Sequence, residues 1–417
     1  MRVLHVISGL DIGGPQQQLR LLLRRLPVSC EVVNLGGPGA VAEGLRVDGV
    51  RVTHLGVPDP RDPSALARLV RLIRDGRYHL VHTHRCDGGH HAGLAARLAG
   101  VRTVVATEHR LGATTLGGRP LTRRARALYR ATERLRSATV AVSATVASRL
   151  RALGVPADRI HVVPPGVEAH HLRFDHSVRA ATRARLGIPD HAFVVAAVGR
   201  LVPAKGYETL VRAVAALPET QVLLAGDGPE RDRLRRLAVT LGAARRVHLL
   251  GDCAGPVRPP LGRAPSAHPS VPEVLAAADV FVSPAPEESF GIAVVEALAA
   301  GLPVLHAGCP ALDELPRLQA PGAQRIAPTV RELCAALREQ AAHPARRLPV
   351  PPAVTRYDAD RAAEALATLY TRVYQGAPVP AAAPGAVAAG RASVPSPATR
   401  RHDATPARSG QEEVRAP

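Results

Sequence analysis

The chain is poor in aromatic side chains. Among its 417 residues there is no tryptophan, and phenylalanine, tyrosine and tryptophan together make up 2% of the sequence. Proteins that bind single-stranded nucleic acid rely on rows of aromatic side chains on which the bases stack. This composition, together with the absence of zinc-finger spacing, argues against a nucleic-acid partner.

Cysteine is also scarce. The cysteines are odd in number and form no Cys-x-x-Cys pair, which argues against structural disulfides and structural zinc and fits a reducing compartment. The five residues are Cys30, Cys86, Cys253, Cys309 and Cys334.

Long hydrophobic runs are missing, although 46% of the residues are hydrophobic. No stretch reaches the roughly 18 apolar residues of a membrane-spanning helix. The apolar run at 3–10 is short and is soon followed by Gly13 and Gly14, which is unlike a signal peptide. We therefore expect a cytoplasmic protein with two substantial hydrophobic cores.

The charge is strongly positive, with a formal net value of +19. Of the 54 basic residues Lys205 is the only lysine, which leaves 54 − 1 = 53 arginines. Two interpretations of the charge stay open: peripheral contact with the anionic inner face of the plasma membrane, or an arginine-rich codon usage that enriches solvated surfaces.

Apolar and amphipathic segments alternate along the chain. This rhythm predicts two Rossmann-like halves, each with a doubly wound parallel sheet, joined near 170–190 where the strand pattern lapses. In the first half we expect strands at 2–8, 31–35, 80–84 and 103–107 and helices at 16–26, 65–75 and 93–99. In the second half we expect strands from about 192, at 221–225 and at 247–250, and a last helix at 357–374.

Two glutamates eight positions apart bracket a corner of the second half. The run Val280, Phe281, Val282 predicts a strand, and Ser289 followed by an apolar segment ending at Gly301 predicts a capped helix. Glu288 then lies on the loop and Glu296 on the helix. At a rise of roughly 1.5 Å per helical residue the two carboxylates are at most about 12 Å apart. That spacing suits a sugar nucleotide, with one acid at the ribose and the other at the sugar.

Three glycine-containing turns follow predicted strands. Gly13-Gly14 opens a helix, so its backbone N–H groups could face an anion. Gly199-Arg200 precedes Lys205 in a strand–loop–helix segment, and Gly226 begins the run Gly-Asp-Gly-Pro-Glu. Arg200 and Lys205 add two cations to the second of these segments, and preorganised cations can stabilise a developing negative charge in place of a metal ion.

The chain resembles family 4 of the retaining glycosyltransferases. The residues that carry the resemblance are Ala-Asp279-Val-Phe-Val, Glu288 and Glu296 with seven residues between them, Ala-Leu-Ala-Ala-Gly301-Leu-Pro303-Val, and the Gly199 to Lys205 segment. The resemblance covers about 1–375. It implies the GT-B fold, with an acceptor domain at 1–172, a donor domain at 190–355, a helix at 357–375 that returns to the first domain, and a disordered tail at 376–417. The active site of that fold lies in the cleft between the two domains.

The family assigns roles to matching residues. Arg200 and Lys205 would hold the leaving diphosphate, Glu296 the ribose and Glu288 the sugar, while His109 would line the sugar site near the reacting carbon. No metal or other cofactor is expected. The remaining donor-binding residues implied are Gly13, Gly14, Gly199, Gly226, Phe290 and Gly291.

Other histidines invite competing interpretations. His82 and His84 alternate at a strand end, so both should lie on one face, where acceptor contact and plain packing are equally open. With His90 and His91 they could suggest a metal site. We reject that site because no carboxylate stands at helical ligand spacing beside them.

The function predicted is transfer of a sugar from a nucleotide sugar, UDP- or GDP-linked, to a glycan, glycolipid or small-molecule acceptor, as in bacterial polysaccharide synthesis. Two alternatives remain: a non-catalytic GT-B subunit that binds a partner, and a sugar-nucleotide epimerase. The first is prompted by the loop at 306–314, which has one glycine fewer than the family pattern. Two further departures are an insertion-like stretch at 255–266 and a short proline-rich segment at 346–354.

Overall fold

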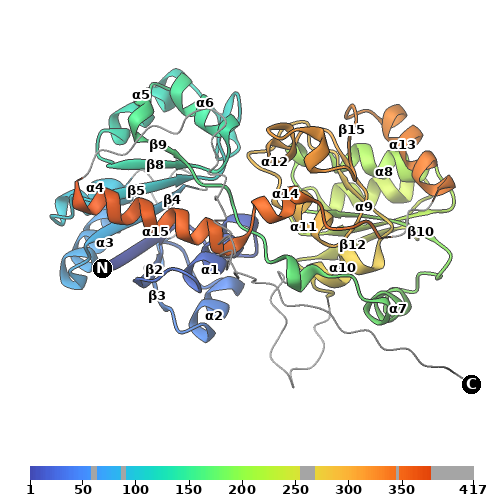
Figure 1. Ribbon diagram of the computed structural model, residues 1–417, viewed down its shortest axis with the longest axis horizontal. Helices are drawn as coiled ribbons and strands as arrows, with labels where there is room; N and C mark the ends of the chain where they lie inside the picture. The colour runs from blue at the N-terminus through green and yellow to red at the C-terminus, as the bar shows by residue number, and fades with distance from the viewer. Residues whose placement is uncertain (58–62, 86–90, 254–267, 344–346, 377–417) are drawn as a thin grey trace, which may run out of the picture. The chain divides into compact units, whose positions relative to one another are not determined.

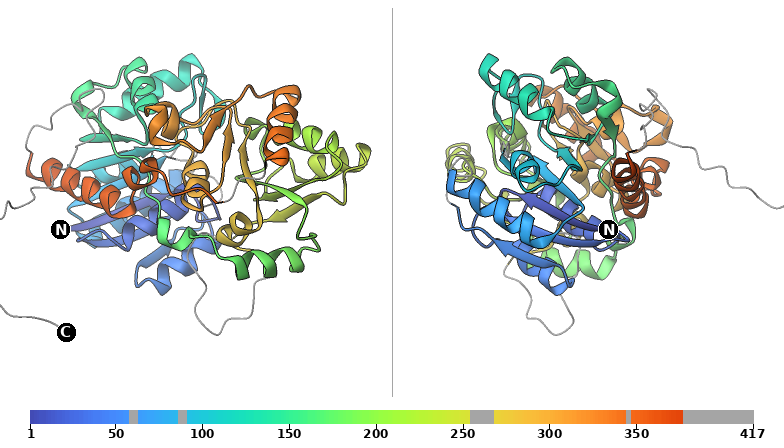
Figure 2. Two further views of the ribbon diagram at one scale, coloured as in Figure 1. Left: turned by 45° about the vertical axis from the view of Figure 1, so that its right-hand side comes forward. Right: turned by 90° about the vertical axis from the view of Figure 1, so that its left-hand side faces the viewer.

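The computed structural model describes residues 1–57, 63–85, 91–253, 268–343 and 347–376. Its main strands form two parallel sheets flanked by helices, as the α/β prediction requires (Figures 1 and 2). The insertion-like stretch at 255–266, the tail from 377 onward, Cys86 and His90 lie outside the described residues. Within the described residues, no helix is both long enough and apolar enough to cross a membrane.

The first sheet has seven parallel strands in the order β3-β2-β1-β4-β5-β8-β9. Its strands are β1 (Arg2–Ile7), β2 (Ser29–Asn34), β3 (Arg51–His54), β4 (Leu80–Arg85), β5 (Val104–Glu108), β8 (Ala138–Ala141) and β9 (Ile160–Val162). A separate antiparallel pair consists of β6 (Thr115–Leu116) and β7 (Arg119–Pro120).

Helices cover both faces of this sheet, because alternate side chains of each strand point to opposite faces. Leu4 and Val6 of β1 pack with α3 and α4, whereas Val3 and Ile7 pack with α1, α2 and α15. The helices are α1 (Gly14–Leu23), α2 (Ala40–Val47), α3 (Pro63–Gly76), α4 (His91–Leu98), α5 (Arg123–Glu133), α6 (Ala144–Ala152) and, from the end of the chain, α15 (Ala359–Gln375). A short 3₁₀ turn, η1 (Ala157–Arg159), precedes β9.

The second sheet has six parallel strands in the order β12-β11-β10-β13-β14-β15. Its strands are β10 (Phe193–Val198), β11 (Thr220–Ala225), β12 (Val247–Gly251), β13 (Val280–Ser283), β14 (Val304–His306) and β15 (Ala323–Arg325). One face packs on α8 (Tyr207–Ala215), α9 (Arg231–Thr240) and α13 (Val330–Ala342), and the other on α10 (Val271–Ala277) and α11 (Ile292–Ala299). Shorter elements are η2 (Ala169–Leu172), η3 (Pro203–Lys205), α12 (Pro310–Asp313), η4 (Arg317–Gln319) and α14 (Pro352–Arg356).

The segment between the sheets, where no strand was predicted, contains helix α7 (His176–Arg185). Asp175 caps this helix by accepting a hydrogen bond from Ser177 N at 2.7 Å. Arg183 on α7 is fully buried, yet its guanidinium donates to Asp279 at 2.9 Å and to the Ala277 carbonyl at 2.9 Å. These bonds tie α7 to the end of α10 and the start of β13.

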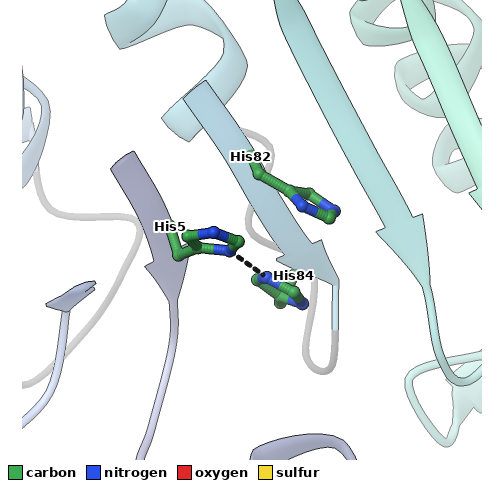
Figure 3. A group of neighbouring side chains, drawn as sticks. All are labelled: His5, His82 and His84. Carbon is green, nitrogen blue, oxygen red and sulfur yellow. Dashed lines mark hydrogen bonds between the residues drawn. The ribbon is translucent and has the colours of Figure 1, made fainter. Parts of the chain in front are cut away.

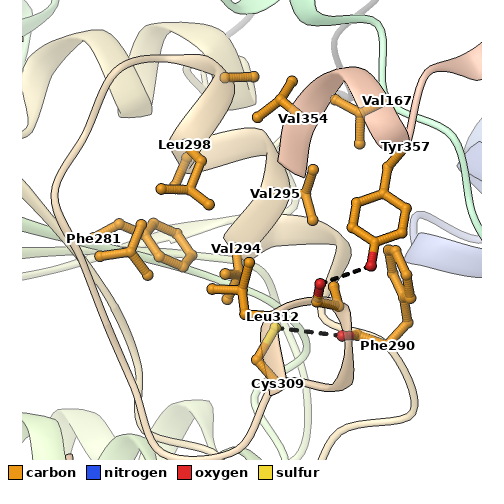
Figure 4. Packing of buried hydrophobic residues seen from close by; sticks show 14 of the residues in the cluster. Val167, Phe281, Phe290, Val294, Val295, Leu298, Cys309, Leu312, Val354 and Tyr357 are labelled. Atoms are coloured by element: carbon orange, nitrogen blue, oxygen red, sulfur yellow. Dashed lines mark hydrogen bonds between the residues drawn. The ribbon is translucent and has the colours of Figure 1, made fainter. Parts of the chain in front are cut away.

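A buried cluster supports the corner between β13 and α11 (Figure 4). The ring of Phe290 meets that of Tyr357 edge-on, with centroids 4.9 Å apart. Tyr357 donates its hydroxyl to the Ala311 carbonyl at 2.7 Å, and the Cys309 thiol donates to the Phe290 carbonyl at 3.4 Å. Contacts with the start of α12 and with Tyr357 at the end of α14 therefore hold the corner between β13 and α11 in place.

The predicted cap of α11 is wrong. The helix begins at Ile292, and its N-cap is Gly291, not Ser289. Gly291 has φ +101°, a conformation that favours glycine, and a Cβ there would lie 2.4 Å from Cys309 Sγ. The chain needs this left-handed turn to enter the helix, and the Ser289 carbonyl instead accepts a hydrogen bond from the Ser143 hydroxyl at 2.7 Å.

Candidate active site

The loop after β10 is shaped by two glycines with positive φ. Gly199 has φ +153°, and a Cβ there would lie 2.7 Å from Tyr207 Oη, while Gly206, at φ +68°, ends the turn η3 and begins α8. Arg200 follows Gly199 at the exposed carboxyl end of the strand. Lys205 is the last residue of η3, so its amine is held close to the same strand end.

Lys205 and Glu288 form a direct ion pair that links the β10 loop to the β13 loop. The lysine side chain is 28% exposed and the glutamate side chain 16%, so solvent screens the pair only partly. The structure thus brings together two residues to which the family resemblance assigns roles at the diphosphate and at the sugar.

Gly226 adjoins this group. A Cβ at Gly226 would lie 2.1 Å from the Gly199 carbonyl oxygen, so the turn after β11 packs directly on the turn after β10. Gly226 N also donates to Gly251 O at 2.7 Å. Only glycine allows this approach, which is consistent with a role in shaping the loop.

Glu296 lies on α11, about one turn after the helix begins at Ile292. Burial raises the pKa of its carboxyl to about 7. It lines a small cavity of about 20 Å³, together with residues of α1 and the segment before η2. The other lining residues are Gln17, Gln18, Arg20, Leu21, Gly166, Val167 and Glu168.

A second, larger cavity lies elsewhere. Its volume is about 480 Å³, and it is lined by Arg25, Pro27 and residues of α15. None of the residues predicted for the site lines it. Cavity size alone would therefore misplace the candidate site, which is defined by the strand ends and their loops.

The N-terminus of α1 faces that of α11. A Cβ at Gly14 would lie 3.5 Å from Ile292 Cδ1, and the N-caps Gly13 and Gly291 form no side-chain capping hydrogen bond. Uncapped N-termini present backbone N–H groups and the positive end of the helix dipole, which favour an anion.

Phe290 contributes to the core at this corner. Its side chain is 4% exposed and packs on Tyr357, so a donor-binding role for Phe290 rests on its backbone. The predicted role stays a prediction.

The histidines expected near the sugar site form one connected group. His109, half-buried after β5, shares a hydrogen bond of 3.1 Å between its Nε2 and His84 Nδ1. His82 is buried, with one nitrogen bonded to the Tyr370 hydroxyl and the other to Thr107 Oγ1 at 2.7 Å. His82 and His84 stack with ring centroids 4.3 Å apart, so they do share one face.

The unusual loop at 306–314 is well packed. Gly308 approaches Pro286 so closely that a Cβ would lie 2.4 Å from the Pro286 carbonyl oxygen. Cys309 N donates to Asp313 Oδ2 at 2.8 Å, and Ala311 N donates to Phe290 O at 2.9 Å. The loop therefore supports the Phe290–Gly291 turn despite its missing glycine.

Two acidic residues near the site were not singled out in the sequence. Glu287 accepts a hydrogen bond from Ala113 N at 2.7 Å and pairs with Arg149 at 2.5 Å. Glu314 accepts from Thr145 N at 2.7 Å, at the start of α6. All three contacts join residues more than 130 positions apart, and no local pattern could have predicted them.

His5 was also missed. It stands among apolar residues, with Val3 and Leu4 before it and Val6 and Ile7 after it, which was the available signal. It pairs with His82 across β1 and β4. Its Nδ1 and His84 Nε2 are 3.0 Å apart.

Comparison with known proteins shows which family the chain resembles. The description Glycosyltransferase Family 4 matches residues 12–171, and Glycosyl transferases group 1 matches residues 192–342. A D-inositol 3-phosphate glycosyltransferase of Streptomyces scabiei is 32% identical over 339 residues, which are 73% of this chain and 73% of that protein. A second, from Catenulispora acidiphila, is 33% identical over 291 residues, 62% of this chain and 65% of that protein.

The fold has clear counterparts among solved structures. The crystal structure of Anabaena HepE in complex with UDP and glucose matches 90% of this chain and 98% of its own, with a TM-score of 0.67 and 20% identity. The predicted GT-B fold and glycosyltransferase class are confirmed, and neither alternative function is favoured. The chain, with its paired Lys205 and Glu288 at the strand ends, belongs to family 4 of the glycosyltransferases.

Proposed function

We propose that this glycosyltransferase moves a sugar from a UDP-sugar to a hydroxyl acceptor with retention of the anomeric configuration. The observation that carries the proposal is the Lys205–Glu288 ion pair, which involves the loop leading into the uncapped N-terminus of α11. The N-terminus of α1 in turn approaches α11 through Gly14 and Ile292. Cationic and dipolar groups converge there with a carboxylate. A nucleotide sugar needs both, because its diphosphate is anionic and its sugar carries hydroxyl donors.

Each residue has a role in the proposed reaction. Lys205 and Arg200 neutralise the charge that develops on the departing diphosphate, and Glu288 accepts hydrogen bonds from sugar hydroxyls. Glu296 accepts hydrogen bonds from the ribose. His109 contacts the sugar near its anomeric carbon.

The chemical step needs no nucleophile from the protein. The bond between the anomeric carbon and the phosphate oxygen breaks, and the acceptor oxygen bonds to the same face of that carbon. The acceptor proton passes to the departing phosphate oxygen, so atoms and charge balance. Positioning and electrostatic stabilisation are then the main contributions of the protein, and neither requires a metal ion.

UDP is the preferred nucleotide of the donor because the HepE structures hold UDP and glucose or UDP-glucose. For the acceptor, the names of the Streptomyces and Catenulispora relatives make D-inositol 3-phosphate the first probe. A glycan or glycolipid acceptor is the broader class. The net charge of +19 supports peripheral contact with an anionic membrane that carries such a lipid.

The test combines transfer with stereochemistry. Purified full-length protein is incubated with UDP-glucose or GDP-mannose and candidate acceptors, and the anomeric configuration of the product is read by NMR. We expect a retained product from the UDP-sugar and a loss of turnover of at least about a hundredfold in Lys205→Ala. Arg235→Ala, which removes an exposed arginine paired with Asp232 on α9, is the matched control.

An inverted product would overturn the proposed stereochemistry. Full turnover in Lys205→Ala, with the control equally active, would remove the leaving-group role of the lysine.

A further inference from the structure

A row of three hydrogen-bonded histidines runs from the core of the first sheet to His109. His5 on β1 and His84 on β4 lie side by side (Figure 3). They are on the sheet face that α15 covers, which is the face of Val3 and Ile7. His5 Nδ1 is 3.0 Å from His84 Nε2, and His84 Nδ1 is 3.1 Å from His109 Nε2. His5 is 1% exposed and His84 is 4% exposed. The row therefore links a fully buried imidazole to the residue predicted to line the sugar site.

His82 holds the row in place from one side. Its ring stacks on that of His84, and its nitrogens bond to Tyr370 and Thr107. Since both nitrogens are occupied, His82 does not exchange hydrogen bonds with the row and serves as a fixed wall.

The ligand atoms of His5, His82 and His84 are close enough to one another to suggest a metal site. Hydrogen bonds account for the group better. Five of the six ring nitrogens already have hydrogen-bond partners within the described residues, and a metal ion would have to displace several of them. The sixth, His5 Nε2, is buried without a partner.

This unpartnered atom decides the direction of the row. A neutral imidazole carries one N–H donor and one acceptor nitrogen. If His5 carried its proton on Nε2, a buried N–H would be orphaned, and orphaned donors are rarer than under-satisfied acceptors. His5 therefore carries its proton on Nδ1 and donates a hydrogen bond to His84 Nε2. His84 must then carry its proton on Nδ1 and donate to His109 Nε2.

Burial favours the neutral form of every member. It lowers the pKa of His5 to about 3 and that of His109 to about 4, and it lowers the pKa of His84 well below its usual value. Each ring therefore carries a single proton near neutral pH, which the directional row requires.

We propose that His5 is a positioning residue: through His84 it fixes His109 as the tautomer protonated on Nδ1, which presents an N–H donor to a hydroxyl or ring oxygen of the donor sugar. The contact with sugar rests on the proposed function, whereas the tautomer does not. No hydrogen bond to His109 Nδ1 is formed by the described part of the chain, so this N–H is available to a ligand.

The first measurement is the tautomer itself. Long-range ¹H–¹⁵N NMR of histidine-labelled full-length protein distinguishes a protonated from an unprotonated ring nitrogen, and His109→Asn assigns the His109 signals. We expect His109 protonated on Nδ1 in the wild type. Protonation on Nε2 would overturn the inference without any variant of His5.

Two substitutions then test the dependence on His5. His5→Leu removes the donor and should leave His109 as a mixture of tautomers, while His5→Asn, whose amide can donate to His84, should restore the single form. The His248 ring, bonded to Gln221 on the other sheet, is the internal control and should not change. An unaltered His109 tautomer in His5→Leu would contradict the role.

Activity separates this inference from the proposed function. With UDP-glucose, His5→Leu should lower kcat by about tenfold with a smaller change in KM, as for other partners that orient a histidine, and His5→Asn should recover it. If the tautomer follows His5 but His109→Asn keeps full turnover, the positioning holds and the sugar contact fails. If neither the His109 tautomer nor the turnover changes in His5→Leu, the positioning role is wrong, while the glycosyltransferase function stands.

Discussion

Lys205 and Glu288, which are 83 positions apart in the sequence, form an ion pair at the carboxyl ends of β10 and β13. The pair places a carboxylate on the cation that a diphosphate would use. If Lys205 binds the diphosphate as proposed, donor binding must share or displace this contact. Glu288 both orients the lysine and weakens its attraction for an anion.

Glu288→Gln should tighten the binding of UDP alone while lowering transfer. Removing the carboxylate leaves Lys205 with its full charge, which we expect to lower the Kd by about fivefold, as for a partly exposed charge pair. Transfer from UDP-glucose should fall, because the sugar loses its carboxylate partner. Calorimetric titration with UDP and a turnover assay measure the two effects.

Glu287→Gln is the matched control, since Glu287 pairs with Arg149 instead of Lys205. An equal gain in UDP affinity in both variants would mean that net charge, and not the ion pair, sets the effect.

Donor binding should depend on pH through Glu296. Burial raises the pKa of this carboxyl to about 7. In the role proposed for Glu296, the ionised carboxylate accepts hydrogen bonds from both ribose hydroxyls. The Kd for UDP-glucose should therefore rise by about tenfold between pH 8 and pH 6. Titration of the protein with UDP-glucose at several pH values between 6 and 8 measures this change in Kd. UDP-glucose is a better probe than UDP, because the diphosphate of UDP-glucose does not take up a proton in this pH range.

In Glu296→Gln the pH dependence of UDP-glucose binding should disappear. A profile that keeps its slope in the variant would place the titrating group elsewhere.

Glu296 should also limit the stability of the protein without ligand. Because its pKa is higher in the folded state, folding takes up a proton between about pH 4.5 and 7, and the free energy of unfolding falls as pH rises through that window. Glu296→Gln should be more stable than wild type by about 2 kcal/mol at pH 8 and equal to it at pH 4. Urea unfolding at the two pH values measures the difference, and a pH-independent difference would exclude this cause.

Gly291→Ala should be strongly destabilising, by about 3 kcal/mol. The residue has φ +101°, and an added Cβ would meet Cys309 Sγ at 2.4 Å, so strain and overlap act together. Gly242→Ala is the control: it has φ +65° and open space around a Cβ, and should lose only about 1 kcal/mol. Denaturant unfolding compares the two.

The double variant Gly291→Ala with Cys309→Ala relieves the overlap but not the strain. Adding Gly291→Ala to the Cys309→Ala variant should therefore cost less stability than adding it to the wild type. No recovery would mean that backbone strain alone accounts for the effect.

The sequence predicted what is local to a strand, a loop or a helix. The strand at Val280, the glutamates at 288 and 296 and the turn at Lys205 were found because strand and helix patterns change at those positions. Ser289 was wrongly predicted as the cap because a serine before an apolar segment is a good N-cap signal. The actual cap is a glycine in the left-handed conformation, against which Cys309 packs, and that contact joins residues far apart in sequence.

Contacts across strands could not be predicted in the same way. The partnership of His5 with His84 depends on β1 lying beside β4, which only the sheet order fixes. The contacts of Glu287 with Ala113 and Arg149 likewise depend on the packing of segments far apart in sequence.

The protein has one lysine side chain, Lys205, and it is half-buried. Every other basic side chain is an arginine or a histidine, so an amine-directed reagent such as an acylating label can modify just one side chain besides the terminal amine. That side chain lies at the candidate active site. If Lys205 holds the donor diphosphate as proposed, bound donor shields its amine, and acylation counted by mass spectrometry reports the fraction of protein with an occupied donor site.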